Sequence, residues 1–321
     1  YEETARMHPD NVVVRNGRAE VLKVLGRLPE ALAAYEETAR LHPENVVARN
    51  GRAEVLKALG RLPEALVAYE ETARMHPDDA VVRTGRAEVL KALGRLPEAL
   101  AAYEETARMH PDNVVVRNGR AEVLKALGCL PEALAAYEET ARRYPENPVT
   151  RNGMAHILVR MREWDRALAL LPEDASGRED WVGLHIRGML YLRRGQFDAA
   201  RTIFERGVRD CPFVDSRDFF RTALVMTSPR QNRPQEAAEE LKAVTTPALA
   251  TPARVLQLHA YGAMGDVRKA KRADDAIPKQ VTGVVLDLRL ELERRYIQKK
   301  PRQHDDAWVF EKELDMLADY A

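Results

Sequence analysis

The amino-acid sequence predicts an all-α solenoid built from stacked antiparallel helical hairpins. Residues 46–79, VVARNGRAEVLKALGRLPEALVAYEETARMHPDD, recur at 80–113 with five substitutions. Tyrosine marks the same phase at an unbroken spacing of 34 residues, at Tyr1, Tyr35, Tyr69, Tyr103 and Tyr137. A fixed period of this length is typical of repeat proteins, in which each unit buries its apolar face against its neighbours.

The regular part of the chain is expected to begin within a repeat. Residues 1–11 open with the same pattern as Tyr69–Pro77, and we expect them to be the second helix of a unit whose first helix lies upstream. Four near-identical units follow within residues 12–147, at 12–45, 46–79, 80–113 and 114–147. Because each unit contacts only its neighbours, the core of such an array grows with the number of units.

The first half of each unit is predicted to form a helix, as residues 46–79 illustrate. The apolar residues at helical spacing form one stripe, which predicts a helix over 46–59. This stripe comprises Val46, Val47, Ala53, Leu56 and Leu59. Gly60 is expected to end the helix, because glycine adopts the left-handed conformation that follows a helix without strain.

The second half of the unit is predicted to form a helix that runs back along the first. Pro63 and Glu64 suit a first helical turn, where proline is tolerated and a carboxylate complements the helix dipole. The helix is expected to bury Leu62, Ala65, Leu66, Tyr69 and Ala73. Pro77 closes the unit, since a proline disfavours helical geometry at the residue before it.

This pattern resembles the tetratricopeptide repeat, and in particular bacterial proteins with near-identical tandem units. The resemblance rests on Gly60 at the turn, Ala65, the aromatic Tyr69 and the terminal Pro77, all at the period of 34. It implies a right-handed superhelical solenoid of helix-turn-helix repeats. Residues 181–214 resemble a further repeat through Gly188, Tyr191, Gly195, Phe197, Ala200, Phe204 and Pro212.

The remainder of the chain is predicted to hold irregular repeats. Residues 148–180 form a degenerate repeat and linker, in which Arg162 replaces the turn glycine. Residues 181–277 form divergent repeats. Their later helix pairs are expected at 219–244, with a lengthened loop at 228–234, and at 251–277. Residues 278–321 are expected to cap the array with helices at Val281–Gln298 and Asp306–Tyr320, because a terminal repeat needs a polar outer face.

The composition narrows the class of partner. Lys+Arg and Asp+Glu are both 50, so the formal net charge is zero and the basic excess of a nucleic-acid-binding protein is missing. No apolar run approaches the roughly 18 residues of a membrane span, and no secretory signal is visible. Cys129 and Cys211 lie far apart, which fits a reducing compartment. We therefore predict a cytoplasmic protein with no membrane partner.

The candidate site is a polar stripe on the first helix of each unit, which the resemblance places on the concave surface where partners bind. Asn50, Glu54 and Lys57 share one helix face. An asparagine can both donate to and accept from a peptide backbone, and Glu–Lys ladders favour a partner of mixed charge. Stacking gives the ladders Asn16, Asn50, Thr84, Asn118 and Asn152; Glu20, Glu54, Glu88, Glu122 and His156; and Lys23, Lys57, Lys91 and Lys125.

A structural interpretation of this stripe stays open. Near-identical repeats repeat every position, and Glu54 with Lys57 is also an ordinary surface pair worth tenths of a kcal/mol. Gly51 bears on the choice, because glycine inside a helix costs roughly 1 kcal/mol relative to alanine. Its recurrence in each unit indicates close approach of a second helix or of a ligand.

No feature predicts catalysis, a metal or a cofactor. His42, His76 and His110 recur once per unit, which should place them on the order of 10 Å apart, too far to share a metal at about 2 Å. No nucleophile motif, phosphate-binding loop or metalloprotease motif occurs in the sequence. We expect each histidine to lie at a helix C-terminus, and we expect the chain not to be an enzyme.

The leading functional hypothesis is therefore a non-catalytic interaction scaffold that binds a peptide or protein segment in its concave groove. Residues 148–321 would then supply specific contacts, since identical repeats cannot define a unique register, and oligomers could form through the array ends. One alternative is the sensory or regulatory arm of a larger bacterial effector enzyme whose catalytic domain lies outside these residues. A second is RNA binding, because V-V-x-x-N and the following motif also resemble the pentatricopeptide repeat. The period of 34 and the Glu ladder oppose RNA.

Overall fold

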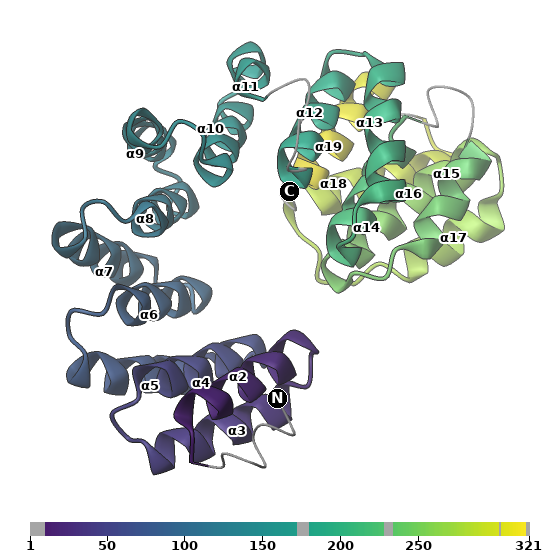
Figure 1. The fold of residues 1–321 in the computed structure, drawn as a ribbon. Helices are drawn as coiled ribbons and strands as arrows, with labels where there is room; N and C mark the ends of the chain where they lie inside the picture. The colour runs from purple at the N-terminus through teal and green to yellow at the C-terminus, as the bar shows by residue number, and fades with distance from the viewer. Residues whose placement is uncertain (1–9, 172–179, 228–233, 302, 319–321) are drawn as a thin grey trace. The chain divides into compact units, whose positions relative to one another are not determined.

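The computed structural model describes residues 10–171, 180–227, 234–301 and 303–318 (Figure 1). Within these ranges all regular structure is helical and no strand occurs, which confirms the all-α prediction. The chain divides into two compact units, Tyr1–Ile157 and Leu158–Ala321, called unit 1 and unit 2 below. The predicted helix at 1–11 and the loop at 228–234 lie almost wholly outside the described residues.

Unit 1 is a tandem array of helical hairpins, as the period predicts. Each hairpin pairs a first helix with a second helix, and each second helix also packs against the first helix of the next hairpin. The pairs are α2 (Val12–Val24) with α3 (Leu28–Leu41), α4 (Val46–Ala58) with α5 (Leu62–Met75), α6 (Ala80–Ala92) with α7 (Leu96–Met109), and α8 (Val114–Ala126) with α9 (Leu130–Arg143). Helix α10 (Pro148–Arg160) follows. In Figure 1, α6, α8 and α10 lie on the inner side of the curve of this array, and α7 and α9 on the outer side.

The predicted helix ends are confirmed by the backbone. Gly60 has a φ of 75°, and its equivalents Gly26, Gly94 and Gly128 are also left-handed. Asn45 caps α4, where its side chain accepts a hydrogen bond from the Ala48 backbone N–H at 2.8 Å. The same turn after α10 is made by Arg162, whose φ is 62°, so the degenerate repeat keeps the turn without its glycine.

The core of unit 1 consists of small and aromatic side chains. Ala53 and Ala65 are fully buried, which allows the two helices of a hairpin to approach closely, and Tyr69 is buried beside them. The prediction that Val47 belongs to this core is wrong, because 54% of this residue is exposed. Adjacent residues on a helix point about 100° apart. The position after Val47, Ala48, lies on the core side and is buried instead.

The recurring glycine of the first helices receives a tyrosine from the preceding repeat. A Cβ placed on Gly51 would lie 2.4 Å from Cε1 and Cζ of Tyr35, closer than any real contact. The same relationship joins Tyr69 with Gly85, Tyr103 with Gly119, and Tyr137 with Gly153. Close packing of a neighbouring helix therefore accounts for a glycine inside each first helix.

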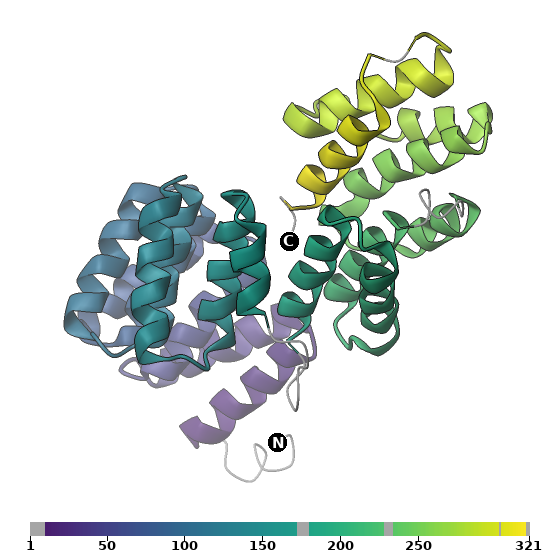
Figure 2. The ribbon, with the colours of Figure 1, turned by 90° about the horizontal axis from the view of Figure 1, so that it is seen from above.

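Unit 2 continues the helical pairs with less regular geometry (Figure 2). Helix α14 begins at Val214, five residues before the predicted start, with Asp215 in its first turn. Phe220 is fully buried against Gly207 and Phe219 is half-buried, as their adjacent positions require. The helices are α11 (Trp164–Leu170), α12 (Trp181–Arg193), α13 (Phe197–Asp210), α14 (Val214–Val225), α15 (Pro234–Glu240), α16 (Ala250–Ala263) and α17 (Val267–Asp275), with short 3-10 turns η1 (Leu241–Ala243) and η2 (Pro247–Leu249).

The end of the described chain is the pair α18 (Gly283–Leu292) and α19 (Asp306–Ala318), with the π-helical turn η3 (Glu293–Ile297) directly after α18. Helix α19 contacts α16 through a largely buried pair, in which His259 Nδ1 and Glu313 Oε1 are hydrogen-bonded. The His259 ring also stacks on Tyr296 of η3.

Candidate functional site

The predicted stripe lies on the first helices of unit 1, and Figure 1 shows α6, α8 and α10 of these on the inner side of the array. We call this surface the inner face. Its residues occupy equivalent positions of α2, α4, α6, α8 and α10. In the second hairpin these are Val47, Asn50, Glu54 and Lys57, which share one side of α4 because their spacings of three, four and three residues approximate whole helical turns.

The asparagines of the stripe are buried between consecutive first helices. Asn50, Thr84, Asn118 and Asn152 are only 6–8% exposed. Asn16 Nδ2 donates to Oδ1 of Asn45, the cap of the next first helix, at 3.0 Å. Asn118 contacts the next cap, Asn147, in the same way at 3.4 Å, and its Oδ1 accepts from Thr150 Oγ1 at 2.9 Å. These amides bind neighbouring repeats, and direct contact with a partner stays a prediction for them.

The glutamates and lysines form half-exposed rungs between consecutive repeats. Lys23 Nζ lies 2.7 Å from Glu54 Oε2 in the next repeat and 2.8 Å from Glu20 on its own helix. Lys57 pairs with Glu88 in the same way, while Lys125 pairs with Glu122 of its own helix at 2.7 Å. Each rung has exposed surface on both side chains, so its net contribution to folding is roughly 0–1 kcal/mol.

In two repeats a buried tyrosine donates a hydrogen bond to the glutamate of the stripe. Tyr35 donates to Glu20 Oε2 at 2.9 Å, and Tyr137 donates to Glu122. Burial acts to raise the pKa of Glu20, but hydrogen bonds from Lys23 and Tyr35 outweigh it and hold that pKa below its ordinary value. Glu20 is therefore ionised at neutral pH.

The structure adds a row of valines that the sequence interpretation had assigned to the core. Each lies three residues before the asparagine position of its helix, which is Thr84 in α6, and so on the same face as the glutamate and lysine positions. Their exposed fractions are 73% for Val13, 54% for Val47, 61% for Val81, 57% for Val115 and 57% for Val149. The available signal was the spacing to Asn50 and Glu54, which sets Val47 on the polar stripe rather than on the apolar one.

The stripe changes at α10. His156 takes the position of the glutamates and is half-buried, and Asn152 keeps the asparagine position. Thr150 replaces the apolar residue found one helix earlier at Val116, and it supplies the hydroxyl bonded to Asn118. The inner face therefore has a chemically distinct end.

The recurring histidines lie at the ends of second helices, as predicted. His42, His76 and His110 are the C-cap residues of α3, α5 and α7. A ring nitrogen of His110 lies 2.9 Å from the Asp78 carbonyl oxygen, and Tyr144 makes the equivalent contact to Asp112. In the part of the chain that the structure describes, no three His, Cys, Asp or Glu side chains cluster as metal ligands would. Likewise, none of its helices has the length and apolar character needed to cross a bilayer.

Comparison with known proteins agrees with this geometry. Two family profiles, both described as tetratricopeptide repeat, match the chain, one at residues 16–80 and 84–148 and the other at 181–206. No match was found among curated proteins.

Solved structures with this fold include three of low sequence identity. A tetratricopeptide repeat protein from Parabacteroides merdae ATCC 43184 superposes with a TM-score of 0.60 and 16% identity, covering 78% of this chain and 98% of that one. A chain of the APC/C hetero-tetramer Cut9–Hcn1 has a TM-score of 0.58 and 17% identity over 84% of this chain and 50% of its own. The type IV pilus biogenesis factor PilW has a TM-score of 0.54 and 16% identity over 64% and 96% of the two chains.

These similarities concern the fold, which in general supports a scaffold for protein interactions. They agree with the repeat period, with the left-handed turn glycines and with the tyrosine–glycine joints between hairpins. The chain is a tetratricopeptide repeat protein.

Proposed function

We propose that unit 1 is a non-catalytic scaffold that binds an extended segment of a protein partner along its inner face. The observation that carries this proposal is the row of exposed valines at Val13, Val47, Val81, Val115 and Val149. Single exposed apolar residues are common on protein surfaces, but a contiguous apolar patch rimmed by polar groups marks an interaction site. A row with one valine in every repeat offers apolar contact along the whole array.

The energetic argument rests on burial. Covering an exposed valine with a partner stabilises the complex by about 1 kcal/mol. Several valines covered at once therefore supply enough free energy for a measurable affinity. The Glu54 and Lys57 rungs lie beside the valines and form a polar rim of both charges. We assign Glu20, Glu54, Glu88, Glu122, Lys23, Lys57, Lys91 and Lys125 to this rim, and we assign the asparagine positions to holding the repeats at the correct spacing.

We assign to α10 the contacts that fix the register of the bound segment, that is, which repeat each part of the segment contacts. Identical repeats present identical contacts, so a segment could shift by one repeat without loss. His156, which replaces the glutamate of the other repeats, breaks this equivalence at the distinct end. A chain of similar fold was solved within the Cut9–Hcn1 hetero-tetramer, and that assembly supports a role of this kind. The regulatory-arm and RNA-binding alternatives stay predictions from sequence.

The test is selection of short peptides from a displayed library on the full chain, followed by affinity measurements on variants. We expect the selected peptides to contain aliphatic residues and to bind Val81→Asp/Val115→Asp at least about tenfold more weakly, since two buried apolar contacts are lost and charges are introduced. The matched control is Val67→Asp, at an exposed valine on the second helix α5. Equal affinity for both variants would contradict the proposal.

A further inference from the structure

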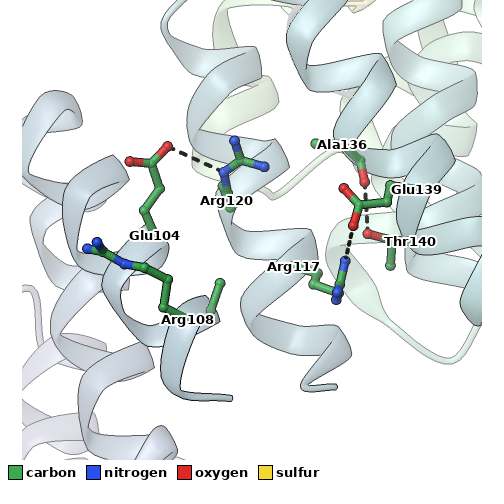
Figure 3. Close-up of a pocket in the computed structure, with 8 residues that line it drawn as sticks. Glu104, Arg108, Arg117, Arg120, Ala136, Glu139 and Thr140 are labelled. Carbon is green, nitrogen blue, oxygen red and sulfur yellow. Dashed lines mark hydrogen bonds and ion pairs between the residues drawn. The ribbon is translucent and has the colours of Figure 1, made fainter. Parts of the chain in front are cut away.

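The outer side of unit 1 carries equivalent pockets in two successive repeats. One pocket of about 430 Å³ lies where α5, α6 and α7 meet, and one of about 400 Å³ lies where α7, α8 and α9 meet. Figure 3 shows the second, with Arg117 and Arg120 on α8 between Glu104 and Arg108 on one side and Glu139 on the other. We propose that these pockets bind the carboxylate groups of an acidic protein segment, at a site separate from the inner face.

Each pocket holds three arginines and two glutamates. In the first pocket these are Arg74, Arg83, Arg86, Glu70 and Glu105. The second pocket has the equivalent residues Arg108, Arg117, Arg120, Glu104 and Glu139. Three positive and two negative side chains leave each pocket with one unbalanced positive charge.

One arginine of each pocket is fixed in place. Arg117 Nε donates to the Pro111 carbonyl oxygen at 2.7 Å, and its Nη1 donates to Glu139 Oε1 at 2.9 Å. Arg83 is held in the same way by the Pro77 carbonyl and by Glu105, with an ion-pair distance of 3.1 Å. Both side chains are largely buried. A guanidinium anchored at both ends loses little conformational freedom when it binds an anion, which favours affinity.

The second arginine of each pocket is Arg86 in the first pocket and Arg120 in the second. Its guanidinium has N–H groups that are not used in hydrogen bonds with other described residues. The distance from Arg86 Nε to Glu70 Oε1 is 3.5 Å, and that from Arg120 Nε to Glu104 Oε1 is also 3.5 Å. Both exceed the length of a normal N–H···O hydrogen bond, so these pairs are electrostatic contacts only. One repeat earlier, Arg52 Nε lies 3.6 Å from Glu36, and this buried nitrogen has no hydrogen-bond acceptor.

The third arginine of each pocket, Arg74 in the first and Arg108 in the second, has no ionic partner within the described structure. Neither Arg74 nor Arg108 forms an ion pair or hydrogen bond with any residue of the described ranges, although both border a pocket. Small neighbours keep the pocket open, since Ala73 and Ala102 line the first one. An incoming carboxylate could therefore accept from the second and third arginines without displacing the fixed ion pair.

The charge balance favours carboxylates over nucleic acid. A carboxylate carries one negative charge, which equals the excess of one pocket. Nucleic acid would place a phosphate at about every 3.4 Å of each strand, and many of these would face the glutamates between pockets. The series of pocket arginines also ends at α10. At the corresponding place in α10, Met154 replaces the second arginine while Arg151 remains. Occupation of several pockets by one segment would raise its apparent affinity through effective concentration.

The test uses a fluorescent twelve-residue glutamate peptide, with a glutamine peptide of equal length and a single-stranded thymidine oligonucleotide as probes for comparison. Binding to the full chain is measured by fluorescence anisotropy at low ionic strength. We expect the glutamate peptide alone to bind, and Arg86→Gln/Arg120→Gln to weaken its binding about tenfold, since charge-assisted hydrogen bonds are lost. The matched control Arg61→Gln/Arg95→Gln removes the same charge from exposed turn arginines paired with Glu64 and Glu98, and should change affinity less than about twofold.

Three results would overturn the proposal. Equal weakening by the two variants would show general electrostatics, equal binding of the glutamine peptide would exclude carboxylate recognition, and tighter binding of the oligonucleotide would indicate nucleic acid instead. If the first variant loses helical circular dichroism, Arg74→Gln/Arg108→Gln replaces it. These arginines are exposed and form no ion pair or hydrogen bond within the described residues, so unchanged affinity in that variant would also reject the pockets.

Discussion

The ring of Tyr69 in one repeat lies directly against Gly85 in the next, at a distance that leaves no room for any side chain. A Cβ on Gly85 would lie 2.4 Å from Cε1 and Cζ of the ring and 2.6 Å from its hydroxyl oxygen. Real carbon atoms do not approach so closely, so the joint between two hairpins requires a glycine. This joint recurs at each tyrosine of unit 1 from Tyr35 to Tyr137.

Gly85→Ala should therefore destabilise the protein. At an unconstrained helix position the same change would stabilise it by roughly 1 kcal/mol, because alanine has the higher helix propensity. Here the added methyl group must displace the ring of Tyr69, and overpacking of this kind costs about 1–3 kcal/mol. Urea denaturation followed by circular dichroism measures the net effect.

The control for this prediction is a variant that lacks the ring of Tyr69. In a Tyr69→Ala background the methyl group meets no ring, and Gly85→Ala should then be neutral or stabilising. A double-mutant cycle therefore gives a coupling free energy between the two positions. If Gly85→Ala raised the denaturation midpoint in the wild-type background, the proposed contact would be wrong.

Arg162→Gly should stabilise the turn after α10. Arg162 has a φ of 62°, and the equivalent turns of unit 1 use glycine. A side chain in the left-handed conformation costs roughly 1–2 kcal/mol, so glycine should raise the free energy of unfolding by about 1 kcal/mol. Thermal unfolding measures the gain. Ala101→Gly, at an exposed position inside α7, is the control and should instead lose about 1 kcal/mol. A loss at both positions would refute the strain argument.

The pair of His259 and Glu313 should make the stability of unit 2 depend on pH. Burial acts to lower the pKa of His259, but the charge of Glu313 and its hydrogen bond outweigh burial and raise that pKa above 6.5. Arg295 opposes this increase and Asp306 adds to it. Because the folded pKa exceeds the unfolded one, the stabilisation is fully present below about pH 6.5 and is lost as pH rises through the folded pKa.

The measurement is the thermal midpoint of the full chain between pH 6 and pH 9. We expect the unit 2 transition to fall with rising pH in the wild type and to lose this fall in Glu313→Gln, because burial without Glu313 lowers the pKa of His259. Glu311→Gln is the control, since Glu311 is exposed on the same helix and pairs with Arg193. That variant should keep the wild-type pH dependence, and loss of the dependence there would point to a different titrating group.

The regular half of the fold could be predicted because its information is local. Gly60 ends one helix, Pro63 starts the next, and the period repeats both signals, so the observed helices differ from the predicted ones by a residue or so. In unit 2 the start of α14 at Val214 was missed. The stripe that contains Phe219 and Phe220 indicates a helix but does not mark its first turn.

The candidate site was harder to predict because exposure depends on contacts between repeats. The sequence places Asn50, Glu54 and Lys57 on one face. It does not reveal that the asparagine lies beneath the surface while Val47 lies on it. Burial of Asn50 depends on how closely neighbouring helices approach, and the Tyr35–Gly51 joint helps to set that distance. The outer pockets require three helices from two repeats, so no single stretch of sequence contains them.

Because one tyrosine–glycine joint connects each hairpin of unit 1 to the next helix, its repeats are interchangeable parts. Removal of residues 80–113 would bring Tyr69 to Gly119, which already accepts the same ring from Tyr103. Such a deletion, or the matching insertion, creates no unfamiliar interface and leaves α10 at the end of the array. Gene rearrangements in whole multiples of the repeat can therefore lengthen or shorten the inner face and change the number of outer pockets while the remaining hairpins fold as before.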